Sequence, residues 1–252
     1  MEFDSTAWIT LARGQPLIPI AAVCVYALGV AHVRRGGKVP TMPELRRVLV
    51  VWNVCMALFS AWCTAIAVPL YLWGSNGLLT RGLVPSVCSN SAWFSRGNPG
   101  VVAVTFTASK FVELGDTLFL ALRKRNLTHL HTFHHAATLL LTWKLFVTRS
   151  STGIAFIAMN AFVHTVMYAY FAAALFPGIG KKLRPYSYLI TAVQISQMLA
   201  GVFINLIAAR VQIAGHSCDA TPTSVAFAGV LYSIYLVLFV QFALERDKEK
   251  KM

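Results

Sequence analysis

Charged side chains are scarce in this sequence. Only 12% of its 252 residues are Asp, Glu, Lys or Arg, whereas 57% are hydrophobic and the mean hydropathy is +0.63. A soluble domain usually carries about 25% charged residues, so this composition excludes a soluble enzyme as well as a disordered chain. What remains is a series of long apolar runs, and these predict an integral membrane protein.

Acidic residues are the rarer of the charged types. The chain has nine Asp and Glu against 22 Lys and Arg, and its formal net charge is +13. A basic balance can indicate nucleic-acid binding. Here, however, the basic residues stand in short clusters at the ends of apolar runs, where such residues orient membrane proteins. We therefore expect membrane lipid as a partner and no nucleic acid.

Long polar linkers are also missing. Seven apolar runs, each of roughly 20 residues or more, predict an all-α integral membrane protein that is a bundle of seven transmembrane helices. The runs cover residues 16–33, 48–73, 100–122, 127–148, 152–176, 186–209 and 224–244. Because the connections are short and no internal repeat is evident, residues 1–252 are expected to form one multi-pass domain.

The distribution of basic residues predicts how the bundle is oriented. Outside the runs, 15 Lys and Arg lie on the face that holds the C-terminus and five on the face that holds the N-terminus. The positive-inside rule then places a short N-terminus in a lumen and the tail 245–252 in the cytosol. Lys248 and Lys250 in this tail resemble a dilysine retrieval signal, which favours the endoplasmic reticulum membrane.

Polar side chains inside membrane spans are costly, so they usually face a protein interior or a cavity. Four of the runs carry such residues, and at 100° per residue each set falls on one helix face. We expect these faces to surround one polar cavity that opens toward the cytosol. In chain order the sets are Lys110, Glu113, Asp116 and Thr117; His131, His134 and His135; Asn160, His164, Met167 and Tyr168; and Thr191, Gln194 and Gln197.

Each set also has a structural interpretation. The charges of the first set could neutralise one another, His164 alone is commonly a packing residue, and glutamine pairs often join helices. The H-x-x-H-H spacing of the second set is harder to explain by packing, and it favours metal binding or acid–base chemistry. His129 points to the other side of the same helix and is expected to stand apart.

A histidine-box metal oxidoreductase is one alternative raised by this spacing. Membrane di-iron sites draw on several histidine boxes, whereas this chain has only seven histidines in all. A single metal held by His131, His134 and a partner stays open, but we expect no metal. A non-enzymatic seven-span transporter or receptor is a further alternative, and it would need a polar pathway that reaches both faces of the membrane.

Four polar motifs follow one another between residues 110 and 197. Residues 110–117 match K-x-x-E-x-x-D-T, 131–135 match H-x-x-H-H, 160–171 resemble N-x-x-x-H-x-x-M-Y-x-Y-Y, and 191–197 match T-x-x-Q-x-x-Q. In type and order these motifs resemble those of the ELO family of fatty-acid elongases. Phe171 departs from the family pattern, which most often has Tyr there, and it removes a hydroxyl without removing a titratable group near neutral pH.

The resemblance implies a 3-oxoacyl-CoA synthase, which condenses a long-chain acyl-CoA with malonyl-CoA and releases CoA and carbon dioxide. It further implies an acyl tunnel enclosed by the helices, no cofactor beyond the two substrates, and a reductase and a dehydratase as partners in the elongation cycle. An anionic CoA needs a basic mouth on the cytosolic side. The candidates for this mouth are Arg123, Lys124, Arg125, Lys181 and Lys182, which equally serve orientation.

Condensation requires an acyl acceptor and hydrogen-bond donors for the oxyanion. Cysteines in apolar surroundings are inert, so an imidazole is the better acceptor. His134 is our first choice, with His131 and His135 positioning it and His164 as base or second imidazole. Asp116 and Glu113 are expected to orient a histidine of the box. The residues expected to bind substrate or carboxylate groups are Lys110, Asn160, Tyr168, Gln194 and Gln197.

Two cysteines lie outside the apolar runs. Cys88 precedes the third run and Cys218 precedes the seventh, so both fall on the expected luminal side. A structural disulfide persists in an oxidising compartment. We therefore predict a disulfide between Cys88 and Cys218.

Overall fold

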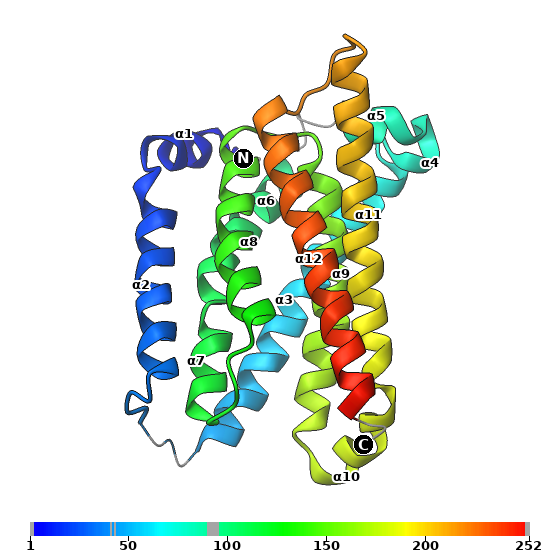
Figure 1. Ribbon diagram of the computed structural model, residues 1–252. Coiled ribbons are helices and arrows are strands. Elements are labelled where there is room, and N and C mark those ends of the chain that lie inside the picture. Colours follow the sequence, from blue (N-terminus) through cyan, green and yellow to red (C-terminus); the bar gives the residue numbers. More distant parts are fainter. Residues whose placement is uncertain (1–2, 41, 43, 90–95, 250–252) are drawn as a thin grey trace.

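The computed structural model describes residues 3–40, 42, 44–89 and 96–249 (Figure 1). Within this part of the chain there is no strand, only an isolated bridge between Asp4 and Arg96. Residues 250–252, with Lys250 of the expected retrieval signal, lie outside the described residues. The helices are α1 (Thr6–Gly14), α2 (Leu17–Arg34), α3 (Leu45–Trp73), α4 (Leu78–Arg81), α5 (Leu83–Cys88), α6 (Gly97–Val112), α7 (Gly115–Leu122), α8 (His129–Val147), α9 (Gly153–Ala174), α10 (Pro177–Leu183), α11 (Ser187–Ile213) and α12 (Pro222–Glu249).

The long helices run alternately up and down one bundle (Figure 1), and six of the seven predicted runs each correspond to one of them. The described N-terminal helix lies at one end of the bundle. The end of α2, the end of α7, helix α10 and the end of α12 all lie at the opposite end (Figure 1). The basic clusters of the sequence therefore gather at a single end, which we call the basic end.

For the described residues, the structure confirms the prediction of an all-α protein with several helices able to cross a membrane. It does not confirm the predicted number of seven spans. Two of the predicted spans do not have the length and apolarity of a spanning helix. The first is divided into α6 and α7, and in the second, α8, four histidines lower the hydropathy. Five segments of the described chain do have this length and apolarity: Leu17–Arg34, Leu45–Arg81, Gly153–Ala174, Pro177–Ile213 and Pro222–Arg246.

Helix α9 is the centre of the bundle, and α3 packs against it more extensively than any other helix pair in the described chain. The buried residues of α3 recur every three or four positions, which places them on one seam. Many of the buried side chains of both helices are small, such as Ser60, Cys63 and Ala67 of α3 and Ala158 and Ala161 of α9, and small side chains allow helix backbones to approach closely.

The third predicted run does not form one continuous helix. The backbone tightens after Val112, where Leu114 donates to Phe111 O, Asp116 to Glu113 O and Thr117 to Leu114 O, all in the i→i+3 pattern. Such short turns change the direction and phase of the side chains that follow. The segment therefore divides into α6 and α7, and Glu113 lies at the junction.

A disulfide joins the two cysteines that lie outside the apolar runs. Cys88 ends α5 and bonds to Cys218 in the connection between α11 and α12, with the Cα atoms 4.4 Å apart. The neighbouring Asp219 donates its backbone N–H to Cys88 O at 2.8 Å. This bridge closes the end of the bundle opposite the basic end (Figure 1).

Gly201 allows α11 and α12 to pack closely. A Cβ atom at this position would lie 2.1 Å from Cδ1 of Tyr232, well inside van der Waals contact. At Gly229 on α12, by contrast, the nearest atom to such a Cβ would be Cβ of Asn205 at 3.6 Å, which is an ordinary contact. Only Gly201 is therefore required by the packing.

We expect Gly201→Ala to lower the free energy of unfolding by about 1–3 kcal/mol, because the rigid ring of Tyr232 must move. Gly229→Ala is the matched control, since it adds the same methyl group in a helix where space exists, and it should be neutral or slightly stabilising. Thermal unfolding of the purified proteins in detergent measures both effects. Equal midpoints for the two variants would contradict the packing described here.

Candidate functional site

An ion pair is buried where α6 ends. Lys110 and Glu113 are 2% and 4% exposed, and Nζ donates to Oε1 at 2.7 Å. Ser109 Oγ donates to the same carboxylate oxygen at 3.1 Å, and the ammonium lies 4.1 Å from the ring centroid of Phe106. The structural interpretation of these charges is therefore correct for Lys110 and Glu113, which neutralise one another.

The ion pair also positions a histidine on α9. Lys110 Nζ donates to Asn160 Oδ1 at 2.8 Å, which turns the Asn160 amide nitrogen toward His164 Nε2 at 3.2 Å. Because an amide nitrogen can only donate, Nε2 accepts and the proton of a neutral ring resides on Nδ1. That nitrogen faces Glu113 Oε1 at 3.8 Å. Four residues from two of the predicted motifs thus form one network.

Asp116 has different partners from those expected. Its two carboxylate oxygens accept hydrogen bonds from Trp52 Nε1 at 2.7 Å and from the Tyr168 hydroxyl at 2.6 Å. Among the described residues, neither the Asp116 nor the Glu113 carboxylate bonds directly to a histidine of the box, and the histidine beside Glu113 is His164. That either carboxylate orients or polarises a box histidine stays a prediction. Trp52 comes from α3, and Gly115 makes room for it, since a Cβ there would lie 3.0 Å from the indole.

The three histidines of the box lie together in the first two turns of α8. His131 Nε2 is 2.9 Å from Thr117 Oγ1, which is in turn 2.8 Å from the hydroxyl of Tyr26 on α2. The ring of His135 lies between the other two, with centroids 4.3 Å from His131 and 5.6 Å from His134. His129 is exposed and makes no ring contact with the three, as expected.

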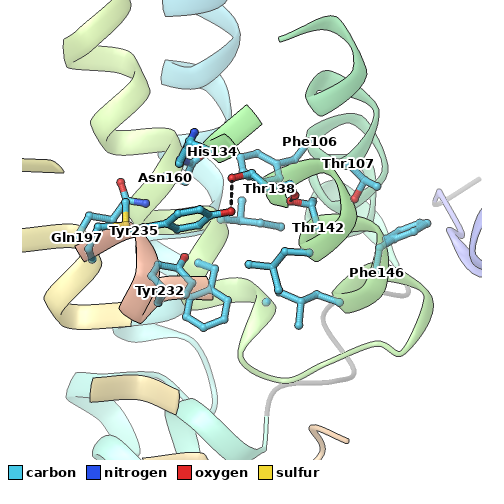
Figure 2. Close-up of a pocket in the computed structure, with 16 residues that line it drawn as sticks. Phe106, Thr107, His134, Thr138, Thr142, Phe146, Asn160, Gln197, Tyr232 and Tyr235 are labelled. Carbon is cyan, nitrogen blue, oxygen red and sulfur yellow. Dashed lines mark hydrogen bonds between the residues drawn. The ribbon is translucent and has the colours of Figure 1, made fainter. Parts of the chain in front are cut away.

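His134 faces a cavity inside the bundle (Figure 2). The cavity holds about 530 Å³ of empty space, including the part continuous with its opening. Its wall is mainly apolar, and it extends along α8 from His134 to Leu145 and Phe146, away from the basic end. The lining residues at the His134 end include Asn160, whose amide also holds His164.

The expected polar cavity is therefore mainly apolar, with His134, Asn160 and Tyr235 among its polar lining residues. Asp116 and His131 are not among its lining residues, although they lie on the predicted helices. Gln197 lines it and is buried, whereas Gln194 bonds to Met167 Sδ at 3.5 Å instead. The two glutamines of one motif thus have separate roles, which helix periodicity alone does not reveal.

Helix α12 contributes residues that the sequence analysis missed. Tyr235 lies beside His134 with ring centroids 4.9 Å apart, and its hydroxyl is 3.1 Å from Thr138 Oγ1 (Figure 2). Tyr232 also lines the cavity, and Phe239 contacts His134 at 6.0 Å. The spacing of these three aromatic residues places them on one helix face, and two hydroxyls on that face were the available signal.

Several predicted residues lie outside the cluster. The basic residues expected at a CoA mouth are exposed at the basic end, and they touch none of the histidines. Phe171 is 44% exposed and packs on Tyr170, so the position that departs from the motif pattern does not face the cavity. In the described part of the chain, no three His, Cys, Asp or Glu side chains are arranged as metal ligands. The basic residues are Arg123, Lys124, Arg125, Lys181 and Lys182.

Comparison with known proteins gives a consistent result. Residues 11–252 match the family described as "ELO: GNS1/SUR4 family". The chain is 36% identical to "Fatty acid elongase 1" of Trypanosoma brucei brucei over 201 residues, which are 78% of this chain and 65% of that protein, slightly less than two thirds of its length. It is 37% identical to "Very long chain fatty acid elongase 6" of Mus musculus over 207 residues, covering 80% of this chain and 74% of that protein.

The buried ion pair between Lys110 and Glu113 is expected to affect the stability of the fold. Lys110→Met leaves Glu113 buried without its cation, and we expect it to lower the free energy of unfolding by roughly 3 kcal/mol. Lys110→Met combined with Glu113→Gln removes both charges and should recover a large part of that loss. Unfolding in detergent measures both proteins. If the double variant is no more stable than the single one, the carboxylate is not what makes Lys110 necessary.

Proposed function

This chain belongs to the ELO (GNS1/SUR4) family, and from this premise we propose that it is a fatty-acid elongase. It condenses a long-chain acyl-CoA with malonyl-CoA to give 3-oxoacyl-CoA, CoA and carbon dioxide. One observation carries the proposal: His134 lies between a basic end of the molecule and a mainly apolar cavity. A thioester that joins an anionic carrier to an alkyl chain needs these surroundings in this order.

The cavity is the proposed site of the acyl chain. Sites for small molecules typically have apolar walls and a few polar groups, and this cavity has both. Leu141, Leu145 and Phe156 offer contacts to methylene groups. With the chain in this cavity, the thioester carbonyl lies beside His134 and the CoA extends toward the basic clusters, which supply an attractive potential.

In the proposed reaction, a ring nitrogen of His134 attacks the thioester carbonyl. A C–N bond forms, the C–S bond breaks, and CoA leaves as the thiolate and takes up a proton. Malonyl-CoA then loses carbon dioxide, and the enolate carbon attacks the acyl-imidazole. The new C–C bond forms as the C–N bond breaks. The ring replaces the N–H proton that it gave to the CoA thiolate with one from the solvent, so the imidazole is restored and no cofactor is consumed.

The surrounding side chains would assist this reaction by position and hydrogen bonding. Asn160 and Tyr235 line the cavity near His134 and are proposed donors to the oxyanion. His164, held by Asn160 with Glu113 behind it, is the proposed base or second imidazole. Lys110 is not itself a lining residue of the cavity but donates to Asn160, which is, so it acts through Asn160 as a positioning residue.

We further propose an endoplasmic reticulum location with all seven passes crossing the membrane. The 15-to-5 distribution of basic residues supports a cytosolic basic end. The Cys88–Cys218 disulfide at the opposite end suits an oxidising lumen. In this orientation the product leaves on the cytosolic side, where a 3-oxoacyl-CoA reductase and a dehydratase can act on it.

The acyl acceptor is tested by His134→Ala. The rate of condensation is measured as carbon dioxide release from labelled malonyl-CoA with a panel of acyl-CoAs. This rate should fall at least about a thousandfold, as it does when other enzymes lose their nucleophile. Acyl-CoA binding should persist, because the acceptor contributes to the reaction path more than to ground-state affinity. The exposed His216 provides the control, and His216→Ala should keep full activity. A stable acyl adduct on a cysteine of the native enzyme would overturn the imidazole mechanism.

The proposed orientation is tested at a glycosylation sequon. Asn126 and Thr128 form an N-x-T sequence in the exposed connection between α7 and α8 at the basic end. A cytosolic sequon is not glycosylated, so Asn126 should be unmodified in the protein isolated from cells, and treatment with a glycosidase should not change its mass. A glycan on Asn126 would place the basic end in the lumen and refute the orientation.

A further inference from the structure

Helix α2 stands at the edge of the bundle (Figure 1). Of its 18 residues only Pro19 and Val30 are buried, and its principal contact is with α8. Between these two helices lies an open groove, separate from the cavity at His134, with about 870 Å³ of empty space including its open side. Because α2 is long and apolar enough to cross a membrane, a groove along it would be open to lipid.

The walls of the groove are apolar along most of its length. Ala27, Val30 and Ala31 face it from α2, and Phe133 and Ala136 face it from α8. Three of these five side chains are alanines, whose small size leaves space between the two helices. The shape is therefore that of a slot for flexible hydrocarbon chains.

At the basic end the groove is lined by Arg34, Arg35 and His129. Arg34 Nη2 donates to Leu127 O at 2.9 Å and to Thr132 Oγ1 at 3.1 Å, which fixes the guanidinium beside the first turn of α8. The N-terminal end of that 19-residue helix also favours an anion. Among the described residues, neither Arg34 nor Arg35 forms an ion pair with a carboxylate.

We propose that this groove binds one anionic glycerophospholipid. Its phosphate lies beside Arg34 and His129, the further anionic group of its headgroup, such as the carboxylate of phosphatidylserine, lies beside Arg35, and its acyl chains fill the apolar slot between α2 and α8. The groove combines several cationic or donor groups at one end with a hydrocarbon-lined space at the other, which is the chemistry of a phospholipid and its headgroup. Arginine is suited to the phosphate because its planar donors can bind two oxygens at once.

Such a lipid would cover the outer side of the histidine box. Tyr26 lines the groove and bonds to Thr117, which bonds to His131. Tyr26 and Thr117 therefore link the groove to the box. A bound lipid therefore keeps the hydrogen bonds of Tyr26 and Thr117 in apolar surroundings, where they are stronger than in water.

The test measures lipid retention and needs no catalytic turnover, so its outcome is independent of the proposed function. The full chain is delipidated in detergent, offered phosphatidylserine or phosphatidylcholine with identical acyl chains, and analysed by native mass spectrometry. We expect one phosphatidylserine to be retained, and phosphatidylcholine to be retained about tenfold less, as expected when one charge-assisted contact is lost.

Three variants distinguish headgroup binding from chain binding. Arg35→Ala should reduce phosphatidylserine retention about tenfold, and Ala27→Trp should abolish it by filling the slot. Lys38→Ala is the matched control, since it removes an exposed cation from the same connection without touching the groove, and it should retain the lipid fully. Thermal unfolding verifies that each variant is folded. If Ala27→Trp does not fold, Arg35→Ala still tests the proposal, because Arg35 is exposed and its replacement should not disturb the fold.

Equal retention of the two lipids by the native protein would overturn the proposal and leave the arginines with a role in orientation only. Full retention by both Arg35→Ala and Ala27→Trp would also overturn it, because the bound lipid would then lie elsewhere. Displacement of phosphatidylserine from the native protein by one equivalent of a long-chain acyl-CoA would instead make the groove a substrate entrance, and this too would refute a resident phospholipid.

Discussion

A lysine buried inside an apolar bundle must be compensated by nearby groups, and the rest of the polar site depends on how Lys110 is compensated. Its ammonium group reaches Glu113 within its own segment and Asn160 on α9, so one side chain joins two helices. The contact with Asn160 decides which way that amide is turned, and the amide in turn selects the tautomer of a neutral His164. Because Glu113 lies where α6 gives way to α7, the same pair stabilises the junction from which Asp116 and Thr117 project.

The course of the chain through the bundle follows closely from hydropathy. The run 16–33 corresponds to Leu17–Arg34 and the run 152–176 to Gly153–Ala174, since the ends of such runs are set by where apolar residues stop. The junction after Val112 is different. It contains no proline, and its three i→i+3 hydrogen bonds are not visible in the hydropathy of the sequence. A period of 100° per residue, applied across that junction, therefore places the side chains of α7 on the wrong face.

Contacts within the site could be predicted where the two side chains are close in sequence or belong to one motif. Contacts between side chains that are distant in sequence were missed. Lys110 and Glu113 lie one turn apart, so their pairing follows from helix geometry. Trp52 reaches Asp116 from a helix whose aromatic residues resemble those of any apolar span, and only the packing of α3 reveals the contact. Tyr235 is similar, because a tyrosine in an apolar run fits a membrane interface as well as a cavity.

Helix α8 orders the chemistry along its own axis. It begins at the basic end with Thr128, whose side chain accepts from the N–H of His131, and it carries the histidines in its first turns. Thr138, Leu141 and Leu145 then line the cavity at helical spacing. From His134 to Leu145 the rise is ~16 Å, at 1.5 Å per residue. A single rigid element therefore sets both the place of the polar groups and the depth of the apolar space beyond them, so loop movements at either end leave that distance unchanged.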